Sequence, residues 1–537
     1  MAKQTKPKQN KQKSSTKHMG VLEGRIQNVA WFYTLVFFAL FPLLYDMNKY
    51  LAITKGKYNY FVFLTLSFAF VLAFLYFATM LTGSIKFTSP LPLAKKASFM
   101  QIAMAAYVLT AIVSALLSEY SESVWIGSSR FDGLFTILLY VLLFYLVSFF
   151  SKPSEWFIIG IGGSLTIFAL IGLLQLWNID VLTLYPTDQS FLNLPFVSTI
   201  GNIDIVATYL CIVLPILCVA MITSDQWWRY LLLIPIALGL YLEVLIDVDA
   251  GKVGLLSCAL VLIPMLFRNK KQIMDGVLVL ATIAFTVALG YATDITRTEH
   301  WSGSNIIVET AFNFGGMHKL LIGAAVLFLL IYAALRLYKG EFKVNPKLLT
   351  AVLAALIVLT LIFGAVYIYN NSEDTSNRLL YEIGQIMRGN LQDEFGTYRM
   401  LVWKRALPMA LNGPLFGTGP DTFLPVFTEA FGEEVKAAGL NVVYDFAHND
   451  FIQIMCNLGP VGLIAYLAVL IGAAIGFFRY GCKDRWTLIF GAAVIGYCAQ
   501  SFFSFTIIIT APLFYVALGL LDGCHRRNRE LSKQETN

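Results

Sequence analysis

The feature that most constrains this chain is a series of long apolar runs that recur along nearly its whole length. Each run has about 18 to 23 residues, enough to cross a hydrocarbon core of about 30 Å as a helix. Strands of a membrane barrel would alternate polar and apolar residues, and these runs do not. With 58% hydrophobic and only 13% charged residues, the composition excludes a soluble globular domain. The sequence therefore predicts an all-α polytopic membrane protein.

The apolar runs predict about 14 transmembrane helices, within a range of about 12 to 14. We expect them at residues 28–46, 59–81, 98–117, 132–150, 156–177, 203–222, 229–246, 251–267, 273–292, 319–336, 348–370, 451–479, 486–504 and 506–523.

This pattern divides the chain into five expected parts. Residues 371–450 form the one long polar segment, predicted to be a large extracytoplasmic loop that carries catalytic residues, since loops of such length usually carry function. The other parts are a disordered basic cytoplasmic tail at 1–24, an N-terminal transmembrane bundle at 25–370, C-terminal transmembrane helices at 451–523 and a cytoplasmic tail at 524–537.

Lysine and arginine residues predict the orientation in the membrane. They gather in the N-terminal tail and in alternate short loops, the pattern that the positive-inside rule assigns to the cytoplasmic side. We therefore expect a multi-pass protein of the cell (cytoplasmic) membrane with both termini in the cytoplasm. The first outer loop, with Lys49, Lys55 and Lys57, is an exception to this bias. The net charge of +6 reflects orientation, and no nucleic acid partner is expected.

A histidine, His448, stands where the long polar segment meets the next apolar run. Imidazole is the side chain whose ordinary pKa permits proton exchange near neutral pH. Asn449 and Asp450 follow directly, and Gln453 lies about one helical turn further on. Two interpretations stay open from these residues alone: His448 is a general base, or it is an interfacial residue beside a helix capped by Asn449 or Asp450.

Cationic residues on the predicted outer face form a second set of candidates. Positive charge is depleted and costly there, so its retention suggests an anionic partner such as a pyrophosphate head group. The alternative is structural ion pairing, of Arg130 with Asp132 and of Lys252 with Asp247 or Asp249. The set comprises Arg130, Lys252, Arg297, Arg399 and Arg405.

Three further patterns lie beside these candidates. Residues 398–411 predict an amphipathic helix broken by Pro408, with Arg399 and Trp403 on one face. Asp204 opens a span and either binds sugar hydroxyls or caps the helix. The seven cysteines lie in or beside apolar runs, so neither a disulfide framework nor a metal site is expected.

Several of these motifs resemble those of one family. His448-Asn449 is followed after nine residues by Gly459-x-x-Gly462, with Ala465 at the third glycine position. Together with the blocks upstream, this order resembles the O-antigen ligase and O-antigen polymerase superfamily, bacterial polytopic membrane glycosyltransferases with a GT-C-like fold. The upstream blocks are Arg130-x-x-Gly133-Leu134, Gly201-Asn202, Ala207-x-Tyr209-Leu210, Arg399-x-x-x-Trp403 and 414–423.

The resemblance implies that a preassembled glycan passes from undecaprenyl pyrophosphate to an acceptor hydroxyl at the outer face of the membrane, with inversion and without metal or other cofactor. His448 would be the general base and Arg399 a catalytic pyrophosphate ligand. Lys252, which stands where the family often has arginine, and Arg130 would be further pyrophosphate ligands. The expected substrate-binding residues are Asn449, Asp204, Trp403 and Gln453.

Alternative functions stay open at this point. A polymerase that joins repeat units differs from a ligase only in its acceptor, which is a glycan, a glycolipid or a protein hydroxyl. A lipid-linked glycan flippase has a comparable number of spans, but we would expect ionisable residues near the middle of the membrane in such a transporter. Here the candidates are predicted at one surface, which favours a transferase.

Overall fold

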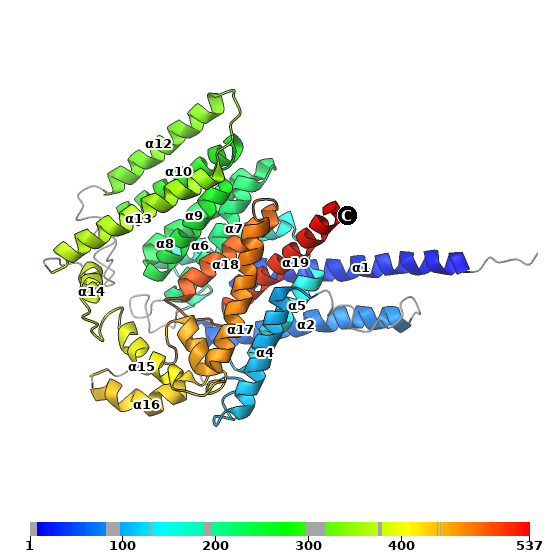
Figure 1. The fold of residues 1–537 in the computed structure, drawn as a ribbon, viewed down its shortest axis with the longest axis horizontal. Helices are drawn as coiled ribbons and strands as arrows, with labels where there is room; N and C mark the ends of the chain where they lie inside the picture. Colours follow the sequence, from blue (N-terminus) through cyan, green and yellow to red (C-terminus); the bar gives the residue numbers. More distant parts are fainter. Residues whose placement is uncertain are drawn as a thin grey trace, which may run out of the picture.

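The computed structural model is a bundle of long helices with a group of shorter helices at one end (Figure 1). Arg297, one of the expected outer cations, lies outside the described residues. The structure describes residues 8–81, 97–127, 130–185, 196–295, 317–373, 378–437, 439–440 and 442–536.

The long helices follow the predicted spans, each of which overlaps one of them. Their bounds are α1 Lys8–Ala39, α2 Ile53–Leu81, α4 Phe99–Leu117, α5 Leu134–Phe150, α6 Glu155–Leu176, α7 Ile203–Thr223, α8 Leu233–Ile246, α9 Asp249–Leu266, α10 Lys270–Ile295, α12 Met317–Leu337, α13 Pro346–Asn371, α17 Asp450–Tyr480, α18 Arg485–Ser501 and α19 Ala511–Thr536. Within the described part of the chain, 11 stretches are long and apolar enough to cross a membrane. A mostly helical, polytopic membrane protein is thereby confirmed, while the number of spans stays a prediction.

Polar side chains at the ends of these helices satisfy backbone groups that would otherwise have no partner. Ser98 and Gln101 form a capping box at the start of α4. Ser154 caps α6, and Asp484 accepts from two amides at the start of α18. Each cap contributes about 1 kcal/mol, and together they explain why the helices begin where they do.

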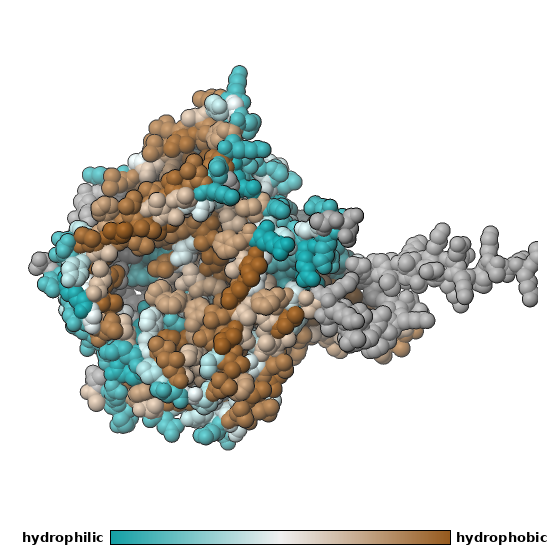
Figure 2. Space-filling view, viewed as in Figure 1, coloured by the Kyte–Doolittle hydropathy of each residue, from teal (hydrophilic) through white to brown (hydrophobic). Residues whose placement is uncertain are grey.

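α7 is the central helix of the bundle. Of its apolar stretch, 94% is buried, because α6, α8, α9 and α18 pack around it. α17 packs against α4, and α19 packs against α5 and α18. Figure 2 shows the opposite situation at the edge, where α12 and α13 present a broad hydrophobic surface. Such a surface suits contact with lipid.

Three short helices lie in the long polar segment: α14 Arg378–Met387, α15 Arg399–Leu411 and α16 Phe423–Ala437 (Figure 1). We call the end of the bundle that carries them the loop end. Leu401, Val402, Ala406, Phe423 and Phe427 form a small core of their own there. α15 also packs against α17, so the segment is attached to the transmembrane part through the helix that follows His448.

The prediction that Pro408 breaks the helix of residues 398–411 is wrong, since α15 continues to Leu411. Proline removes only its own N–H from the helix, and the amide of Asn412 still donates to the carbonyl oxygen of Pro408 at 3.0 Å.

Helical structure extends into both predicted tails where the structure describes them. α1 begins at Lys8, within the stretch predicted to be disordered, and α19 runs to Thr536 through the predicted C-terminal tail. Lysine, arginine, glutamine and glutamate are all good helix formers, so these polar stretches can extend an apolar helix that the bundle already holds.

Lys57, part of the exception to the positive-inside bias, has a structural role. Its side chain is fully buried, and its Nζ donates to the carbonyl oxygens of Phe41 and Pro42, both at 2.8 Å. These carbonyl groups lie where the chain leaves α1, in the turn Phe41–Leu43. The lysine therefore satisfies the end of a helix rather than marking a cytoplasmic loop.

The predicted orientation can be tested at Cys482, the exposed one of the seven cysteines, in the connection between α17 and α18. If this connection is cytoplasmic, a membrane-impermeant maleimide should label Cys482 only after the cells are permeabilised. Glu433→Cys in a Cys482→Ser background places a thiol on α16 instead, where Glu433 is 92% exposed, and should be labelled in intact cells. The same labelling pattern for both thiols would contradict the predicted orientation.

Candidate functional site

His448 occupies an unusual backbone conformation directly before α17. Its φ of 52° lies in the left-handed region, which costs a residue with a side chain about 1–2 kcal/mol. Asn449 then starts the helix, because its Oδ1 accepts from the amides of Phe451 and Ile452, both at 3.0 Å. Of the two capping residues considered from the sequence, Asn449 is the N-cap. The turn at His448 directs the imidazole away from the helix that follows.

The hydrogen bond of the imidazole ring sets its tautomer. Nδ1 of His448 lies 3.1 Å from the carbonyl oxygen of Phe446. A carbonyl oxygen only accepts, so Nδ1 carries the proton and Nε2 keeps its lone pair. Burial lowers the pKa of His448, and the positive charge of Arg399 lowers it further, while Asp204 and Asp445 act in the opposite direction. The ring is therefore neutral near pH 7 and can accept a proton at Nε2.

Two predicted substrate-binding residues instead contact the residue before the histidine. Nε1 of Trp403 donates to the carbonyl oxygen of Ala447, and the amide of Ala447 donates to Oε1 of Gln453, each at 2.8 Å. Trp403 comes from α15 and Gln453 from the first turn of α17. These two helices thus hold the histidine turn between them.

Arg399 lies at the start of α15 and faces the start of α7. Its Nη2 is 3.9 Å from Oδ2 of Asp204, and both side chains are partly exposed. Nε of Arg399 is buried without a hydrogen-bond partner. Asp204 is not the N-cap of α7, as one interpretation had it, because Asn202 accepts from the Asp204 amide and leaves the carboxylate to face Arg399. A hairpin of Phe196–Val197 with Gly201–Asn202 leads into this cap.

Arg130 lies on the other side of the histidine turn. Its Nε donates to Oδ2 of Asp445 at 2.8 Å, whereas the sequence suggested Asp132 as its partner. Asp132 accepts instead from the hydroxyl of Tyr140, at 3.1 Å. Asp445 was not among the sequence candidates, although its place three residues before His448 was a usable signal. Asp445 acts on the pKa of His448, so this carboxylate lies between Arg130 and the base in the network of contacts.

Lys252 has the ion pairs that the structural alternative expected. It contacts Asp247, and its Nζ is 3.1 Å from Oδ1 of Asp249. Lys252 and Asp204 both act on the buried carboxylate of Glu243, so the lysine adjoins the Asp204 side of the site. Its charge is nevertheless directed at the carboxylates beside it.

Arg405, one turn and a half beyond Arg399 on α15, is turned away from the site. It pairs with Asp393 at 2.8 Å and also with Glu434. This arginine therefore has a structural role in the segment of residues 371–450, joining α15 to α16 and to the chain before α15.

α17 is kinked at Gly459, which has φ 70° and ψ −179°. The backbone of Gly417 packs directly against this kink. A Cβ on Gly459 would overlap the carbonyl oxygen of Leu415 and lie 2.5 Å from the Gly417 nitrogen. In return, the amides of Thr418 and Gly419 donate to the carbonyl oxygens of Cys456 and Asn457, at 3.2 and 2.9 Å. The backbone at Gly417–Gly419 and the kink at Gly459 thus join residues 371–450 to α17.

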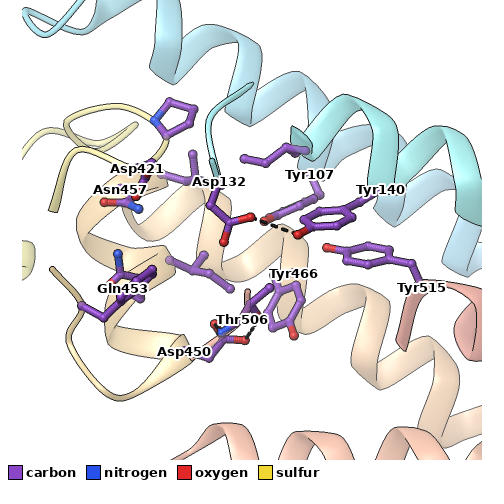
Figure 3. A pocket seen from close by; sticks show the side chains of 15 residues that line it. Tyr107, Asp132, Tyr140, Asp421, Asp450, Gln453, Asn457, Tyr466, Thr506 and Tyr515 are labelled. Carbon is purple, nitrogen blue, oxygen red and sulfur yellow. Dashed lines mark hydrogen bonds between the residues drawn. The ribbon is translucent and has the colours of Figure 1, made fainter. Parts of the chain in front are cut away.

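A cavity of about 50 Å³ is lined by Phe446, next to the histidine turn, and by residues of the first turns of α17 (Figure 3). Asp450 lines one side of the cavity, and its carboxylate accepts from the amide and the hydroxyl of Thr506, at 3.0 and 2.6 Å. Nε2 of Gln453 and Oδ1 of Asn457 are buried there without partners. The volume is enough for a few water molecules, which such groups require. In the described part of the chain, no group of three His, Cys, Asp or Glu side chains could hold a metal ion.

The structure thus brings His448, Arg399, Asp204, Arg130 and Asp445 together at the loop end. A neutral imidazole with a free Nε2 lies in the electric field of Arg399. This arrangement can remove a proton from a hydroxyl group while cationic side chains stabilise a developing anion.

The comparison with known families gives one match. Residues 314–467 match the family model described as O-antigen ligase, a segment that contains Arg399, Trp403, His448 and Gly459. The resemblance predicted from these motifs is thereby confirmed for this segment. None of the curated proteins matches the chain.

The backbone contact at the kink predicts a sharp effect of Gly459→Ala. The added methyl group would overlap the chain around Leu415 and force a left-handed conformation on alanine, so we expect a loss of more than about 2 kcal/mol of stability. The melting temperature of the protein in detergent would report it. Gly163→Ala on α6 is the matched control, because nothing lies within 4 Å of its added Cβ. Equal stability of the two variants would disprove the close approach.

The charges around His448 predict how its titration responds to substitution. We expect the rate of modification of His448 by diethylpyrocarbonate, followed by mass spectrometry, to reach half its maximum below pH 6.5. Asp445→Asn removes a charge that raises the pKa, so its midpoint should fall further; Arg399→Gln removes one that lowers the pKa, so its midpoint should rise. Asp393→Asn, which changes a carboxylate paired with Arg405, should leave the midpoint unchanged. Shifts of opposite sign would refute this electrostatic description.

Proposed function

We propose that this chain, whose residues 314–467 belong to the O-antigen ligase family, is a membrane glycosyltransferase that moves a preassembled glycan from undecaprenyl pyrophosphate to an acceptor hydroxyl. The reaction takes place at the outer face of the cytoplasmic membrane. The observation that carries the proposal is the neutral His448, with Nδ1 held by Phe446 and Nε2 free, in the field of Arg399. Hydroxyl deprotonation beside a cation is the chemistry that such a transfer needs.

The reaction is a single displacement. The acceptor oxygen forms a bond to the anomeric carbon of the glycan while the bond from that carbon to the pyrophosphate oxygen breaks. The hydroxyl proton goes to Nε2 of His448, and undecaprenyl pyrophosphate leaves with the bonding electron pair. Attack opposite the leaving group inverts the anomeric configuration. General base catalysis of this kind contributes about 10²- to 10⁴-fold.

Arg399 is the residue best suited to bind the pyrophosphate. Its contact with Asp204 is loose, at 3.9 Å, so a diphosphate carrying more charge can take the place of the carboxylate. Asp204 is then free to accept from a sugar hydroxyl. Nε of Arg399, which is buried and has no hydrogen-bond partner, offers a further donor to the pyrophosphate.

Arg130 and Lys252 supply the remaining positive charge in this proposal. Each has carboxylate partners, Asp445 for Arg130 and Asp247 and Asp249 for Lys252, and must exchange part of these contacts for phosphate oxygens. With three cationic side chains available, no metal or other cofactor is required to stabilise the leaving group. Asn449, as the N-cap beside the base, lines the approach of the acceptor.

The orientation belongs to the same proposal. Residues 371–450 lie on the extracytoplasmic side with the catalytic residues, and both termini are cytoplasmic. Both candidate catalytic residues lie at the loop end, which fits a transferase acting at one surface better than a flippase that must pass its substrate through the membrane. Ligase, polymerase and protein glycosylation differ in the acceptor alone, which is a glycolipid, a growing glycan or a protein hydroxyl.

Replacement of the base and of the pyrophosphate ligand tests the proposal. Purified protein is incubated with polyprenyl pyrophosphate glycan and with each acceptor class, and products are identified by mass spectrometry. His448→Ala should reduce transfer by about 10²- to 10⁴-fold. Arg399→Ala should cost about 10²-fold or more, and Arg399→Lys less, because lysine keeps the charge but not the bidentate geometry.

Arg405→Gln is the control for loss of a cation on the same helix, since Arg405 pairs with Asp393 and Glu434. It should retain most of the activity. Transfer by a folded His448→Ala protein at the normal rate would eliminate His448 as the base and, with it, the mechanism.

A further inference from the structure

Two backbone amide groups directly precede the base, and both are held by hydrogen bonds. The amide between Phe446 and Ala447 has both of its polar atoms engaged: its carbonyl oxygen accepts from Nδ1 of His448, at 3.1 Å, and its N–H donates to Oε1 of Gln453, at 2.8 Å. Gln453, one amide group and the imidazole thus form a continuous hydrogen-bonded chain. Hydrogen bonds in such a chain polarise one another and strengthen together.

The next amide, between Ala447 and His448, is held from the other helix. Its carbonyl oxygen accepts from Nε1 of Trp403, at 2.8 Å. Rotation of this amide would change φ of His448, which stands at 52°. A residue in such a sparsely populated conformation keeps it only if the surroundings over-determine it. Trp403 and Gln453 supply that restraint from opposite sides of the turn.

The burial of Gln453 indicates that its Oε1 is needed as a hydrogen-bond acceptor and that the side chain does more than fill space. The side chain is 6% exposed, and its Nε2 has no partner. Burial of an amide side chain costs more desolvation free energy than burial of an apolar one, so an apolar side chain would stabilise this position better if only packing mattered. Figure 3 shows the glutamine among the residues that line the cavity.

Trp403 also connects the base to the expected pyrophosphate ligand. It lies one helical turn after Arg399 on the same face of α15. Because its indole contacts the Ala447 carbonyl, α15 sets the position of the imidazole and of the guanidinium group at once. The i, i+4 spacing read from the sequence therefore places the contact to the base and the expected pyrophosphate ligand on one face of one helix.

We propose that Gln453 and Trp403 are positioning residues that act on His448 through the Ala447 backbone, Gln453 by holding the Nδ1–H tautomer and Trp403 by holding the left-handed turn. In this proposal, positioning of the base takes the place of the substrate-binding role expected from the sequence. The inference rests on the proposed function, in which Nε2 of His448 accepts the proton. Neither side chain touches the reacting atoms; each keeps the lone pair of Nε2 directed at them.

Gln453→Met tests the first part, since methionine keeps the length of the side chain but cannot accept from the Ala447 amide. We expect kcat to fall by about 10- to 100-fold, as for residues that orient a catalytic group, with KM for the lipid-linked donor unchanged. The Phe446 hydrogen bond raises the pKa of His448, so its weakening should also move the acid limb of the pH profile to lower pH. Gln453→Glu keeps an accepting oxygen and should restore most of the rate.

Trp403→Phe tests the second part by removing the indole N–H alone. We expect a comparable loss in kcat, and a Trp403→Phe, Gln453→Met double variant that loses less than the product of the single losses, because both act on one turn. Gln385→Met is the matched control: Gln385 is a buried glutamine of α14 whose Oε1 accepts from Asn390. It should leave kcat and the pH profile unchanged.

The outcomes separate this inference from the proposed function. An inactive His448→Ala with a fully active Gln453→Met overturns the positioning role alone, whereas an active His448→Ala overturns the function itself. A rise in KM without a change in kcat in Gln453→Met and Trp403→Phe would show that these residues bind the substrate and do not position the base. If Gln453→Met does not fold, Gln453→Glu and Trp403→Phe are compared with the unmodified protein, provided that their melting temperatures equal its own. A normal kcat in Trp403→Phe then overturns the proposal.

Discussion

The constraint on which the rest of this structure depends is the satisfaction of backbone hydrogen bonds in a medium without water. Within hydrocarbon, every N–H and C=O must find a partner inside the protein, so the apolar runs form helices. Irregular backbone is confined to places where protein or water can serve it. In the described part of this chain, residues 371–450 gather at the loop end, and their backbone around Gly417 pairs with α17 at the kink of Gly459.

The candidate base lies at this same boundary. His448 is the last residue before the cap of α17 and has a left-handed backbone. Its turn is held by side chains from α15 and α17, while Arg399 and Asp204 approach from α15 and α7. The contacts that attach residues 371–450 to α17 therefore also fix the position of the imidazole, as acid–base chemistry requires.

Much of the candidate site could be predicted from the sequence, for definable reasons. His448, Arg399 and Asp204 were found because imidazole, guanidinium and carboxylate groups are costly at a membrane edge and stand out there. Partners were harder to predict. Arg130 pairs with Asp445 and not with Asp132 two residues away, since the backbone directs Asp132 toward Tyr140. Trp403 and Gln453 were recognised as notable positions, but their contact with Ala447 depends on how two helices meet.

The sequence by itself determined that this is a helical membrane protein and where its helices run, because hydrophobic length and local capping are properties of short stretches. It also predicted the family whose model matches residues 314–467, since the order of motifs can be read along the chain. Only the tertiary structure decided which cation is loosely held and which is bound to carboxylates, as with Arg399 and Lys252. It likewise decided the tautomer of His448. The contact of Arg399 joins residues far apart in the chain, whereas the contacts of Lys252 and His448 are local but depend on backbone conformations that the sequence alone leaves open.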